Sequence, residues 1–182
     1  MTSLHDEENR HTAIFSGGCF WCLEQPFEQL SGVLEVAAGY SGGTTENPDY
    51  GLVSSGLTDH LESVRVIFDP EVISYRELVE VFWRQIDPTD DGGQFADRGS
   101  HYRTAIFYTS EEQKKIAQQS KDDLQNSRIF TDPIITPILP ATKFYPAEEY
   151  HQKYYQKNFQ HYSAYKKGSG REAFLRKTWK EK

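Results

Sequence analysis

The two cysteines of the chain, Cys19 and Cys22, are the residues best suited to chemistry. They stand three positions apart after Gly17-Gly18, where a short apolar segment passes into a helical pattern. A thiol at the start of a helix lies near unpaired N–H groups and the positive end of the helix dipole, so we expect the thiolate of Cys19 to be favoured. Cys22 is near enough along one helical face to form a disulfide with Cys19 if the first turn distorts. The spacing therefore predicts a redox-active thiol pair.

Two other interpretations of the cysteines are weaker. An isolated cysteine is most often a small buried side chain, but the C-x-x-C spacing after two glycines favours chemistry. A metal site needs about four ligands. The histidines His60, His101 and His151 show no ligand spacing with one another or with the cysteines, so we expect no metal.

Phe20 and Trp21 stand between the cysteines. Neighbouring helical positions point in different directions, so at most one of these rings can belong fully to the core. Aromatic residues are by default core residues, but a ring beside Cys19 can also form the wall of a pocket. Their placement predicts a pocket next to the thiolate.

The composition limits the class of partner. The chain has 182 residues, with 27 acidic and 20 basic side chains and a formal net charge of −7. An acidic surface repels phosphate backbones and anionic lipids, so we expect neither nucleic acid nor membrane as a partner. No stretch has the apolar length of a membrane span, and residues 1–10 are polar where a secretory signal is apolar. These features predict a cytoplasmic protein that acts on a small molecule or another protein.

The pattern of elements predicts one α+β domain over residues 12–182 with an extended C-terminal tail, after a flexible segment over residues 1–11. The order β-α-β, loop, β-α-β is that of a ferredoxin-like split βαβ two-layer sandwich, to which peripheral helices are added. The long loop over 44–60 is a candidate for function. Strands are expected over 12–15, 33–40, 63–68, 102–108 and, at an edge, 134–139. Helices are expected over 19–30, after a Ser74–Glu77 capping box up to Pro88, after Ser110, and over 147–157.

The segment Gly17-Gly18-Cys19-Phe20-Trp21-Cys22 resembles the active-site motif of the A-type peptide methionine sulfoxide reductases. The resemblance runs from about Thr12 to His161. Its further blocks, in order, are Gly39-Tyr40-Ser41-Gly42-Gly43, Asn47-Pro48-Asp49-Tyr50, His60-Leu61-Glu62, Asp69-Pro70, Asp97-Arg98-Gly99-Ser100-His101-Tyr102-Arg103 and Phe144-Tyr145-Pro146-Ala147-Glu148.

This resemblance implies a role for each matched residue. A sulfoxide sulfur is a poor electrophile until its oxygen is protonated or strongly hydrogen-bonded, so the chemistry needs a thiolate paired with an acid. An aromatic pocket would raise the pKa of that acid toward neutral pH. Taken alone, the same carboxylates and tyrosines would be solvated, turn-forming or packing residues. The implied roles are nucleophile for Cys19, acid for Glu62, hydrogen bonding around the sulfoxide oxygen for Tyr50, Asp97 and Tyr102, and binding of the substrate methyl group for Phe20 and Trp21.

The resemblance also implies a catalytic cycle. After attack, Cys19 becomes a sulfenic acid, which condenses with a nearby thiol. The family often has recycling cysteines near the C-terminus, but this chain has none after Cys22, so a Cys19–Cys22 disulfide is the expected route. Thioredoxin, or dithiothreitol in vitro, is the implied external reductant, with no bound cofactor. The implied activity is the repair of peptide-bound and free methionine S-sulfoxide after oxidative stress, by a monomer.

Gly168-Ser169-Gly170-Arg171 resembles family members that carry a second reductase domain, and here we expect only the A-type activity. Two other functions stay open. A general dithiol-disulfide oxidoreductase would reduce insulin without any sulfoxide. A metal- or peptide-binding module with structural thiols would be purified with metal and would lose no thiol to a sulfoxide.

Overall fold

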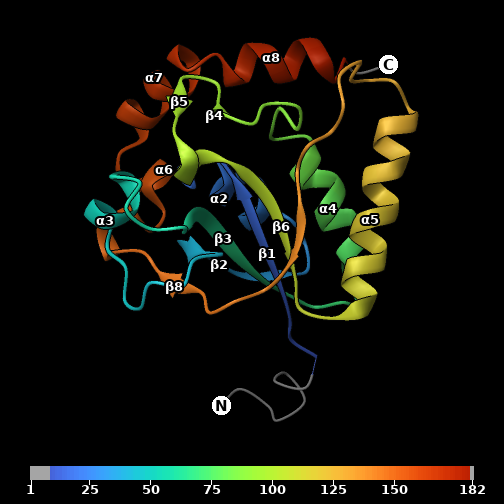
Figure 1. The fold of residues 1–182 in the computed structure, drawn as a ribbon, viewed down its shortest axis with the longest axis horizontal. Coiled ribbons are helices and arrows are strands. Elements are labelled where there is room, and N and C mark those ends of the chain that lie inside the picture. Colours follow the sequence, from blue (N-terminus) through green and yellow to red (C-terminus); the bar gives the residue numbers. More distant parts are fainter. Residues whose placement is uncertain (1–8, 181–182) are drawn as a thin grey trace.

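The computed structural model describes residues 9–180. Its centre is a mixed sheet of six strands, namely β1 (His11–Gly17), β2 (Val33–Ser41), β3 (Leu61–Phe68), β6 (Thr104–Tyr108), β7 (Ile138–Pro140) and β8 (Tyr145–Pro146). The strand order is β7-β6-β1-β3-β2-β8 (Figure 1). The β6–β7 pair is parallel and every other neighbouring pair in this sheet is antiparallel.

The four inner strands follow the arrangement that the sequence predicts. Helix α2 (Trp21–Glu28) connects β1 to β2, and helix α4 (Tyr75–Trp83) leads from β3 toward β6. The resulting order β6-β1-β3-β2 is the one expected for a split βαβ sandwich. Strand β1 begins at His11, one residue before the expected domain boundary, and residues 1–8 of the expected N-terminal segment lie outside the described residues.

The main core lies between this sheet and α2 and α4. Alternate residues of β3 face the helices because successive side chains of a strand point to opposite faces. The ring of Phe15 stacks between Phe27 of α2 and Phe82 of α4, at centroid distances of 5.2 and 5.0 Å. Burial of these aromatic side chains holds α2, and with it the cysteines, against the end of β1.

The helices begin where the sequence predicts in two cases. Ser74 caps α4 through the expected capping box with Glu77, and Ser110 caps α5 (Glu111–Asn126). Helix α2 differs, because it begins at Trp21 and leaves Cys19 in the turn before it.

Two loops and the C-terminal segment hold further short elements. The predicted loop over 44–60 contains α3 (Tyr50–Ser54), and the next loop contains a two-stranded hairpin and the 3-10 helix η1. The expected strand over 102–108 is two residues too long, since Tyr102 belongs to η1. The elements are β4 (Gly93–Gln94), β5 (Asp97–Arg98), η1 (Ser100–Tyr102), η2 (Glu149–His151), α6 (Tyr154–Lys157), α7 (Phe159–Gly168) and α8 (Arg171–Thr178).

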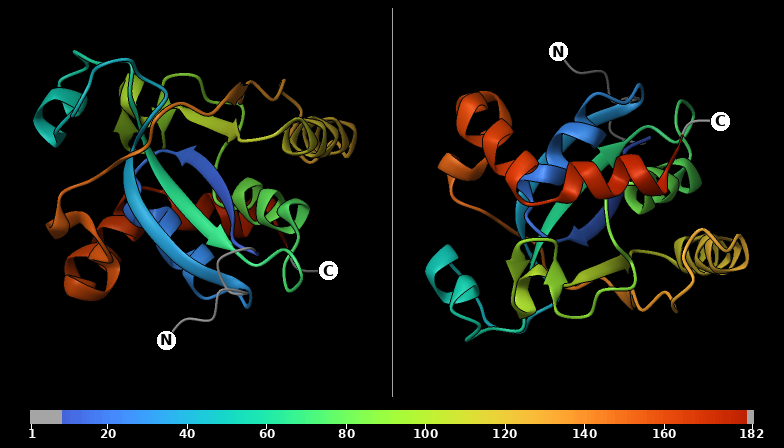
Figure 2. Two further views of the ribbon diagram at one scale, coloured as in Figure 1. Left: turned by 90° about the horizontal axis from the view of Figure 1, so that it is seen from below. Right: turned by 90° about the horizontal axis from the view of Figure 1, so that it is seen from above.

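The prediction of one helix over 147–157 is wrong. The side chain of Gln152 accepts from the N–H of Ala38 and donates to its carbonyl oxygen, both at 2.9 Å, so this stretch is bound to the backbone of β2. Lys153 then takes a left-handed conformation with φ 52°, which interrupts a helix. The chain continues as α6, α7 and α8, which cross the end of the sheet over α2 (Figure 2). No helix within residues 9–180 is long and apolar enough to span a membrane.

Candidate active site

A glycine turn delivers the chain from β1 to the first cysteine. Gly18 has a φ of +86°, which favours glycine, and it is closely surrounded. A Cβ atom at this position would lie 2.7 Å from Cβ of Gln94 and 2.8 Å from Nη2 of Arg171. The turn therefore has no room for a side chain, and Cys19 follows it directly.

Cys19 and Cys22 lie one turn apart and are both free thiols. The N–H of Cys22 donates to the carbonyl oxygen of Cys19 at 3.1 Å, and the two thiols are hydrogen-bonded to each other. Both are buried, with 5% of Cys19 and 1% of Cys22 exposed. The expected thiol pair is thus assembled at the start of α2.

The ionisation of this pair differs from the expectation that the Cys19 thiolate is favoured. Burial raises the pKa of Cys19, and the neighbouring Cys22, Glu62 and Asp97 raise it further. The hydrogen bond from Cys19 lowers the pKa of Cys22, and Arg171 adds to this effect. The physical reason is that Cys19 precedes the helix and is desolvated, while the N–H of Phe20 donates to Glu62. The negative charge of the pair is therefore favoured at Cys22.

Glu62 lies beside this turn, on the face of β3 that meets the helices. Its Oε2 accepts the N–H of Phe20 at 3.2 Å, and only 1% of the residue is exposed. Burial raises the pKa of Glu62 to about 8, and the charge of Asp97 adds to the rise. The site thus holds a carboxyl group that keeps its proton through neutral pH.

Two of the predicted tyrosines, Tyr50 and Tyr102, lie near enough to Cys19 and Glu62 for the charges of these groups to affect them. Tyr50 begins α3 and hydrogen-bonds to Tyr102, which ends η1. Burial raises the pKa of both hydroxyls, and the charges of Glu62 and Cys19 raise them further. They therefore stay protonated and can donate hydrogen bonds.

Asp97 belongs to the same environment and has a partner that the sequence did not predict. It lies in β5 and raises the pKa of Cys19 and of Glu62 through its charge. The hydroxyl of Tyr165 in α7 donates to its Oδ2. The structure therefore brings together all the residues predicted around the sulfoxide oxygen.

Phe20 and Trp21 take the two different places that their neighbouring positions predict. Phe20 is 1% exposed, with its centroid 6.0 Å from Tyr40 and 5.0 Å from His151. Trp21 is half-buried, and its ring stacks on Tyr154 at a centroid distance of 3.8 Å. Its indole N–H donates to Nδ1 of His151 at 3.2 Å, which fixes the orientation of the ring. Trp21 is thus the ring that can form a pocket wall.

The C-terminal segment supplies site residues that sequence reasoning missed. His151 and Tyr154 contact Trp21, and Tyr162 lies beside Cys22. Tyr165 binds Asp97, and Arg171 lies against the glycine turn. The Tyr162 hydroxyl is buried beside Cys22. The density of tyrosines between 150 and 165 is a sequence signal that could have pointed to this segment. By contrast, His60 has a structural role, since its ring binds the backbone of Gly43 and Thr45.

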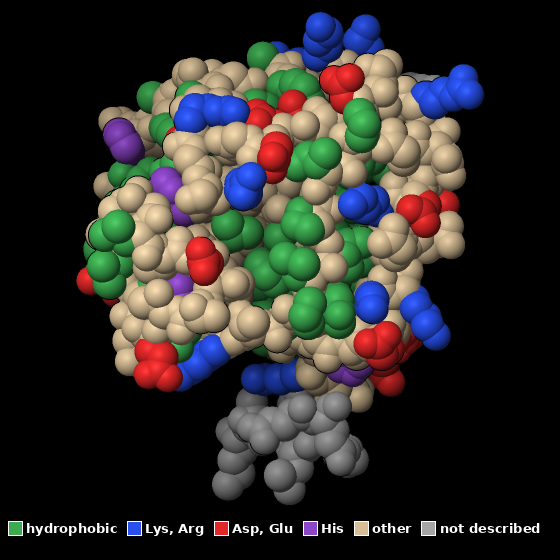
Figure 3. Space-filling view, viewed as in Figure 1, with side chains coloured by type: hydrophobic (Ala, Val, Ile, Leu, Met, Phe, Trp, Pro, Cys, Tyr) green, Lys and Arg blue, Asp and Glu red, His purple; other side chains and the backbone are tan. Residues whose placement is uncertain are grey.

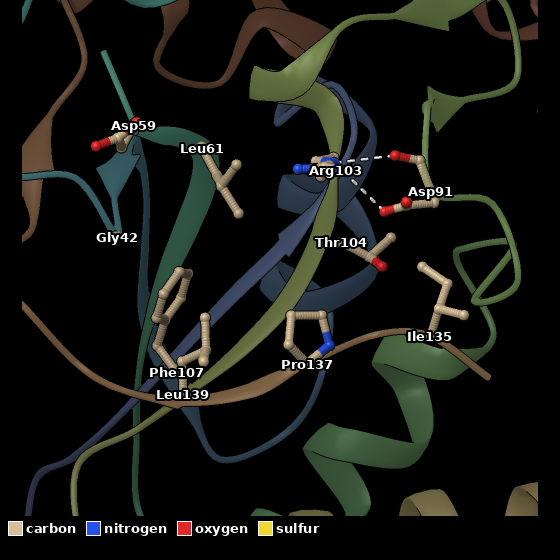
Figure 4. Close-up of a pocket in the computed structure, with 10 residues that line it drawn as sticks. All are labelled: Gly42, Asp59, Leu61, Asp91, Arg103, Thr104, Phe107, Ile135, Pro137 and Leu139. Atoms are coloured by element: carbon tan, nitrogen blue, oxygen red, sulfur yellow. Dashed lines mark hydrogen bonds and ion pairs between the residues drawn. The ribbon is translucent and has the colours of Figure 1, made fainter.

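A pocket of about 260 Å³ lies on the opposite face of the sheet. It opens beside Leu61, which points away from the neighbouring Glu62, and Arg103 at its rim binds Asp91 at 3.0 Å (Figure 4). Hydrophobic side chains gather on this face (Figure 3). None of the predicted site residues lines the pocket. Residues 9–180 contain no group of three or more His, Cys, Asp or Glu side chains placed to hold a metal ion.

The site contains a buried pair of free thiols, as thiol-dependent oxidoreductases require, and comparison with known proteins places the chain further. A profile described as peptide methionine sulfoxide reductase matches residues 11–182. The peptide methionine sulfoxide reductase MsrA of Bacillus licheniformis is 55% identical over 175 residues, covering 96% of this chain and 97% of the relative. The structure of Mxr1 from Saccharomyces cerevisiae in reduced form has a TM-score of 0.79 at 33% identity, covering 84% of this chain and 88% of Mxr1. The structure of Mxr1 in complex with Trx2 has a TM-score of 0.59 at 26% identity, covering 84% and 90%.

The chain belongs to the peptide methionine sulfoxide reductase family, and the relatives identify its class as MsrA. It is an oxidoreductase that reduces methionine sulfoxide with thiols.

Proposed function

We propose that the chain reduces peptide-bound and free methionine S-sulfoxide, with Cys19 as the nucleophile and Glu62 as the acid. The observation that carries this assignment is the hydrogen bond from the N–H of Phe20 to Oε2 of Glu62, which holds the carboxyl group beside the residue next to Cys19. With Oε2 occupied in this way, the proton of Glu62 is available on Oε1. A nucleophile and a proton donor then face the same small volume.

In the first step, the Cys19 thiolate attacks the sulfoxide sulfur while Glu62 protonates the oxygen. The S–S bond made by the attack and the S–O bond of the substrate then both break as a new S–O bond forms to the Cys19 sulfur. Methionine leaves, and the hydroxyl group is transferred to Cys19 as a sulfenic acid. Methionine sulfur is reduced by two electrons and the Cys19 sulfur is oxidised by two. Tyr50, Tyr102 and Asp97 are the proposed hydrogen-bonding groups around the oxygen. In support, burial raises the pKa of the two tyrosine hydroxyls, which keeps them able to donate.

Trp21 and Phe20 are the proposed binding surface for the methyl group of the substrate. The hydrogen bond to His151 and the stack of one indole face on Tyr154 hold the ring rigidly, so substrate binding does not have to order it. Phe20 is 1% exposed and is the proposed inner end of this binding surface.

In the second step, Cys22 condenses with the Cys19 sulfenic acid to form a disulfide and water. An external dithiol then returns both thiols, and no bound cofactor is needed. Mxr1, a relative of similar fold, forms a complex with Trx2. We therefore assign thioredoxin as the reductant here, acting on a single monomeric domain in the cytoplasm, where oxidised proteins are the substrates.

One experiment tests the cycle. Reduced protein is mixed with racemic methionine sulfoxide in a blocked amino acid without any reductant, and methionine formed and thiols lost are both counted. We expect about one methionine per protein and two thiols lost, with only the S epimer consumed. Cys22→Ser should still form one methionine but leave a sulfenic acid, and Cys19→Ser should form none. If wild-type thiols stay free and neither epimer falls, the proposed cycle is wrong.

A further inference from the structure

Arg171 is a buried cation without an acidic partner. It is the first residue of α8, and only 1% of it is exposed. Its Nη1 donates to the carbonyl oxygen of Gln85 at 2.6 Å and its Nη2 to that of Gly17 at 3.0 Å. The guanidinium also lies over the ring of Phe95, at 4.8 Å. No ion pair within residues 9–180 includes Arg171.

Carbonyl oxygens satisfy the N–H groups of Arg171 but do not neutralise its charge. A buried charge that is not paired is costly, so the surroundings of Arg171 should contain an anion. Nη2 is 2.8 Å from the place that a Cβ of Gly18 would occupy, directly before Cys19. The charge of Arg171 favours the ionised form of Cys22, and a thiolate there would supply the missing negative charge.

Cys22 is the thiol whose ionisation Arg171 favours. The titratable and charged neighbours of Cys22 are Cys19 in the turn, Glu62 in β3, Asp97 in β5, Tyr162, Tyr165 and Lys166 in α7, and Arg171 in α8. Glu62 keeps its proton through neutral pH and then carries no charge against a thiolate at Cys22. Asp97 opposes a charge at Cys22, but it already accepts the hydroxyl of Tyr165. Lys166 is half-buried, whereas Arg171 is enclosed, so water screens Arg171 less.

We propose that Arg171 is a positioning residue that compensates a thiolate at Cys22 and so prepares this sulfur to attack oxidised Cys19, an inference that rests on the proposed function. Arg171 itself touches neither substrate nor the reacting oxygen. It acts through Cys22 and through the carbonyl of Gly17, which holds the turn that carries Cys19. The C-terminal helix α8 is thereby part of the second half of the reaction.

The step balances without a further reactant. The Cys22 thiolate attacks the sulfur of the Cys19 sulfenic acid, the S–S bond forms and the S–O bond breaks. Hydroxide leaves and takes up the proton that Cys22 gave up when it ionised, which yields water. The Cys22 sulfur is oxidised by one electron and the Cys19 sulfur is reduced by one.

The first test needs no substrate and therefore does not depend on the proposed function. In the Cys19→Ser chain, the ultraviolet absorbance of the Cys22 thiolate is titrated against pH, in the folded protein and in denaturant. We expect a lower midpoint in the folded chain. Adding Arg171→Gln should raise the midpoint by roughly one to two pH units, and Arg171→Lys should restore most of the change. Arg176→Gln is the matched control, because it removes an exposed arginine from the same helix.

Two results would overturn the proposal. One is a folded Cys19→Ser midpoint at or above that in denaturant, which can be read even if no Arg171 variant folds. The other is an Arg171→Gln midpoint equal to that of the Arg176→Gln control. A purely structural role for Arg171 predicts lower unfolding temperatures in the Gln and Lys variants alike, with no difference between their midpoints.

The second test separates the two halves of the reaction in an otherwise unmodified chain. In one turnover without reductant, the formation of methionine and the loss of the second thiol are timed separately. For each pH unit by which the Cys22 midpoint rises, its thiolate fraction below the midpoint falls about tenfold while its nucleophilicity rises about threefold. Disulfide formation in Arg171→Gln should therefore slow about three- to tenfold relative to methionine formation, compared with the Arg176→Gln control. An unchanged ratio of the two rates contradicts the proposal, whereas absence of methionine in the wild type contradicts the proposed function.

Discussion

Glu62 is the side chain whose ionisation should shape the pH dependence of the first step. The step needs a Cys19 thiolate and a protonated Glu62, and burial places the pKa of Glu62 at about 8 while raising that of Cys19. The rate of methionine formation at sub-saturating sulfoxide should rise up to about pH 8, because the thiolate fraction grows while Glu62 keeps its proton. Above that pH, loss of the Glu62 proton offsets the gain and the rate should level off.

The variant Glu62→Gln removes the titrating group but keeps the acceptor for Phe20. We expect its single-turnover rate at pH 7 to fall by about 10²- to 10⁴-fold and the levelling near pH 8 to disappear. Glu35→Gln on the neighbouring strand β2 is a matched control, since Glu35 is exposed and paired with Arg65. A break near pH 8 that persists in Glu62→Gln would assign it to another group and remove Glu62 from the acid role.

The sequence predicts the types of these residues better than their ionisation. The sequence predicts a raised pKa for Glu62 from its aromatic surroundings, and burial in the structure does raise this pKa. The expectation for Cys19 is wrong because it depended on the helix starting at the cysteine, and a shift of two residues replaces the helix terminus with a desolvated turn. A pattern of residue types cannot locate a helix start this finely.

At the scale of elements, the turn between β1 and α2 is the connection with the least freedom. Gly18→Ala would place a side chain at a positive φ and within 2.8 Å of both Gln94 and Arg171. The backbone strain and the overlap together should lower the free energy of unfolding by roughly 2–4 kcal/mol. Gly170→Ala is the control, because its φ is +87° but nothing lies within 4 Å of its Cβ position. It should cost only about 1–2 kcal/mol, and equal losses in denaturant unfolding would show that the crowding around Gly18 is not important.

The elements that the sequence predicts are those set by local patterns. The capping box of α4 and the alternation of β3 involve neighbours in sequence, and both are confirmed. The helix expected over 147–157 fails because Gln152 binds the backbone at Ala38, more than a hundred residues away. Tertiary hydrogen bonds of this kind override helical periodicity and leave no local trace.

At the scale of the whole molecule, the site is closed by contacts between the two ends of the chain. Trp21 binds His151, and Arg171 binds Gly17. Glu24 of α2 makes a third such contact, because its Oε2 accepts the N–H of Lys153 at 2.8 Å. These contacts hold α6, α7 and α8 over α2. Loss of any of them should therefore disturb the site as well as the fold.

Glu24 should make this closure depend on pH. The residue is fully buried and its Oε1 has no hydrogen-bond partner within the described part of the chain, so burial raises the pKa of Glu24 to about 7. The unfolded chain releases this proton near its ordinary value while the folded chain keeps it, so the free energy of unfolding should fall as the pH rises toward 7 and then level off. Glu24→Gln keeps the acceptor for Lys153 but cannot ionise. It should therefore be more stable than the wild type by roughly 3 kcal/mol above pH 7, and nearly equal to it at pH 4.

Denaturant unfolding from pH 4 to 9 measures this difference, with Glu112→Gln on the exposed face of α5 as the matched control. The Glu24→Gln and wild-type curves should diverge as the pH rises, while the control stays parallel to the wild type. Glu62 ionises by the same mechanism at higher pH, so some decline should persist in Glu24→Gln up to about pH 8. Parallel curves for Glu24→Gln and the wild type over the whole range would mean that Glu24 ionises in the folded chain as it does in the unfolded one, and that the contact with Lys153 holds a carboxylate rather than an acid.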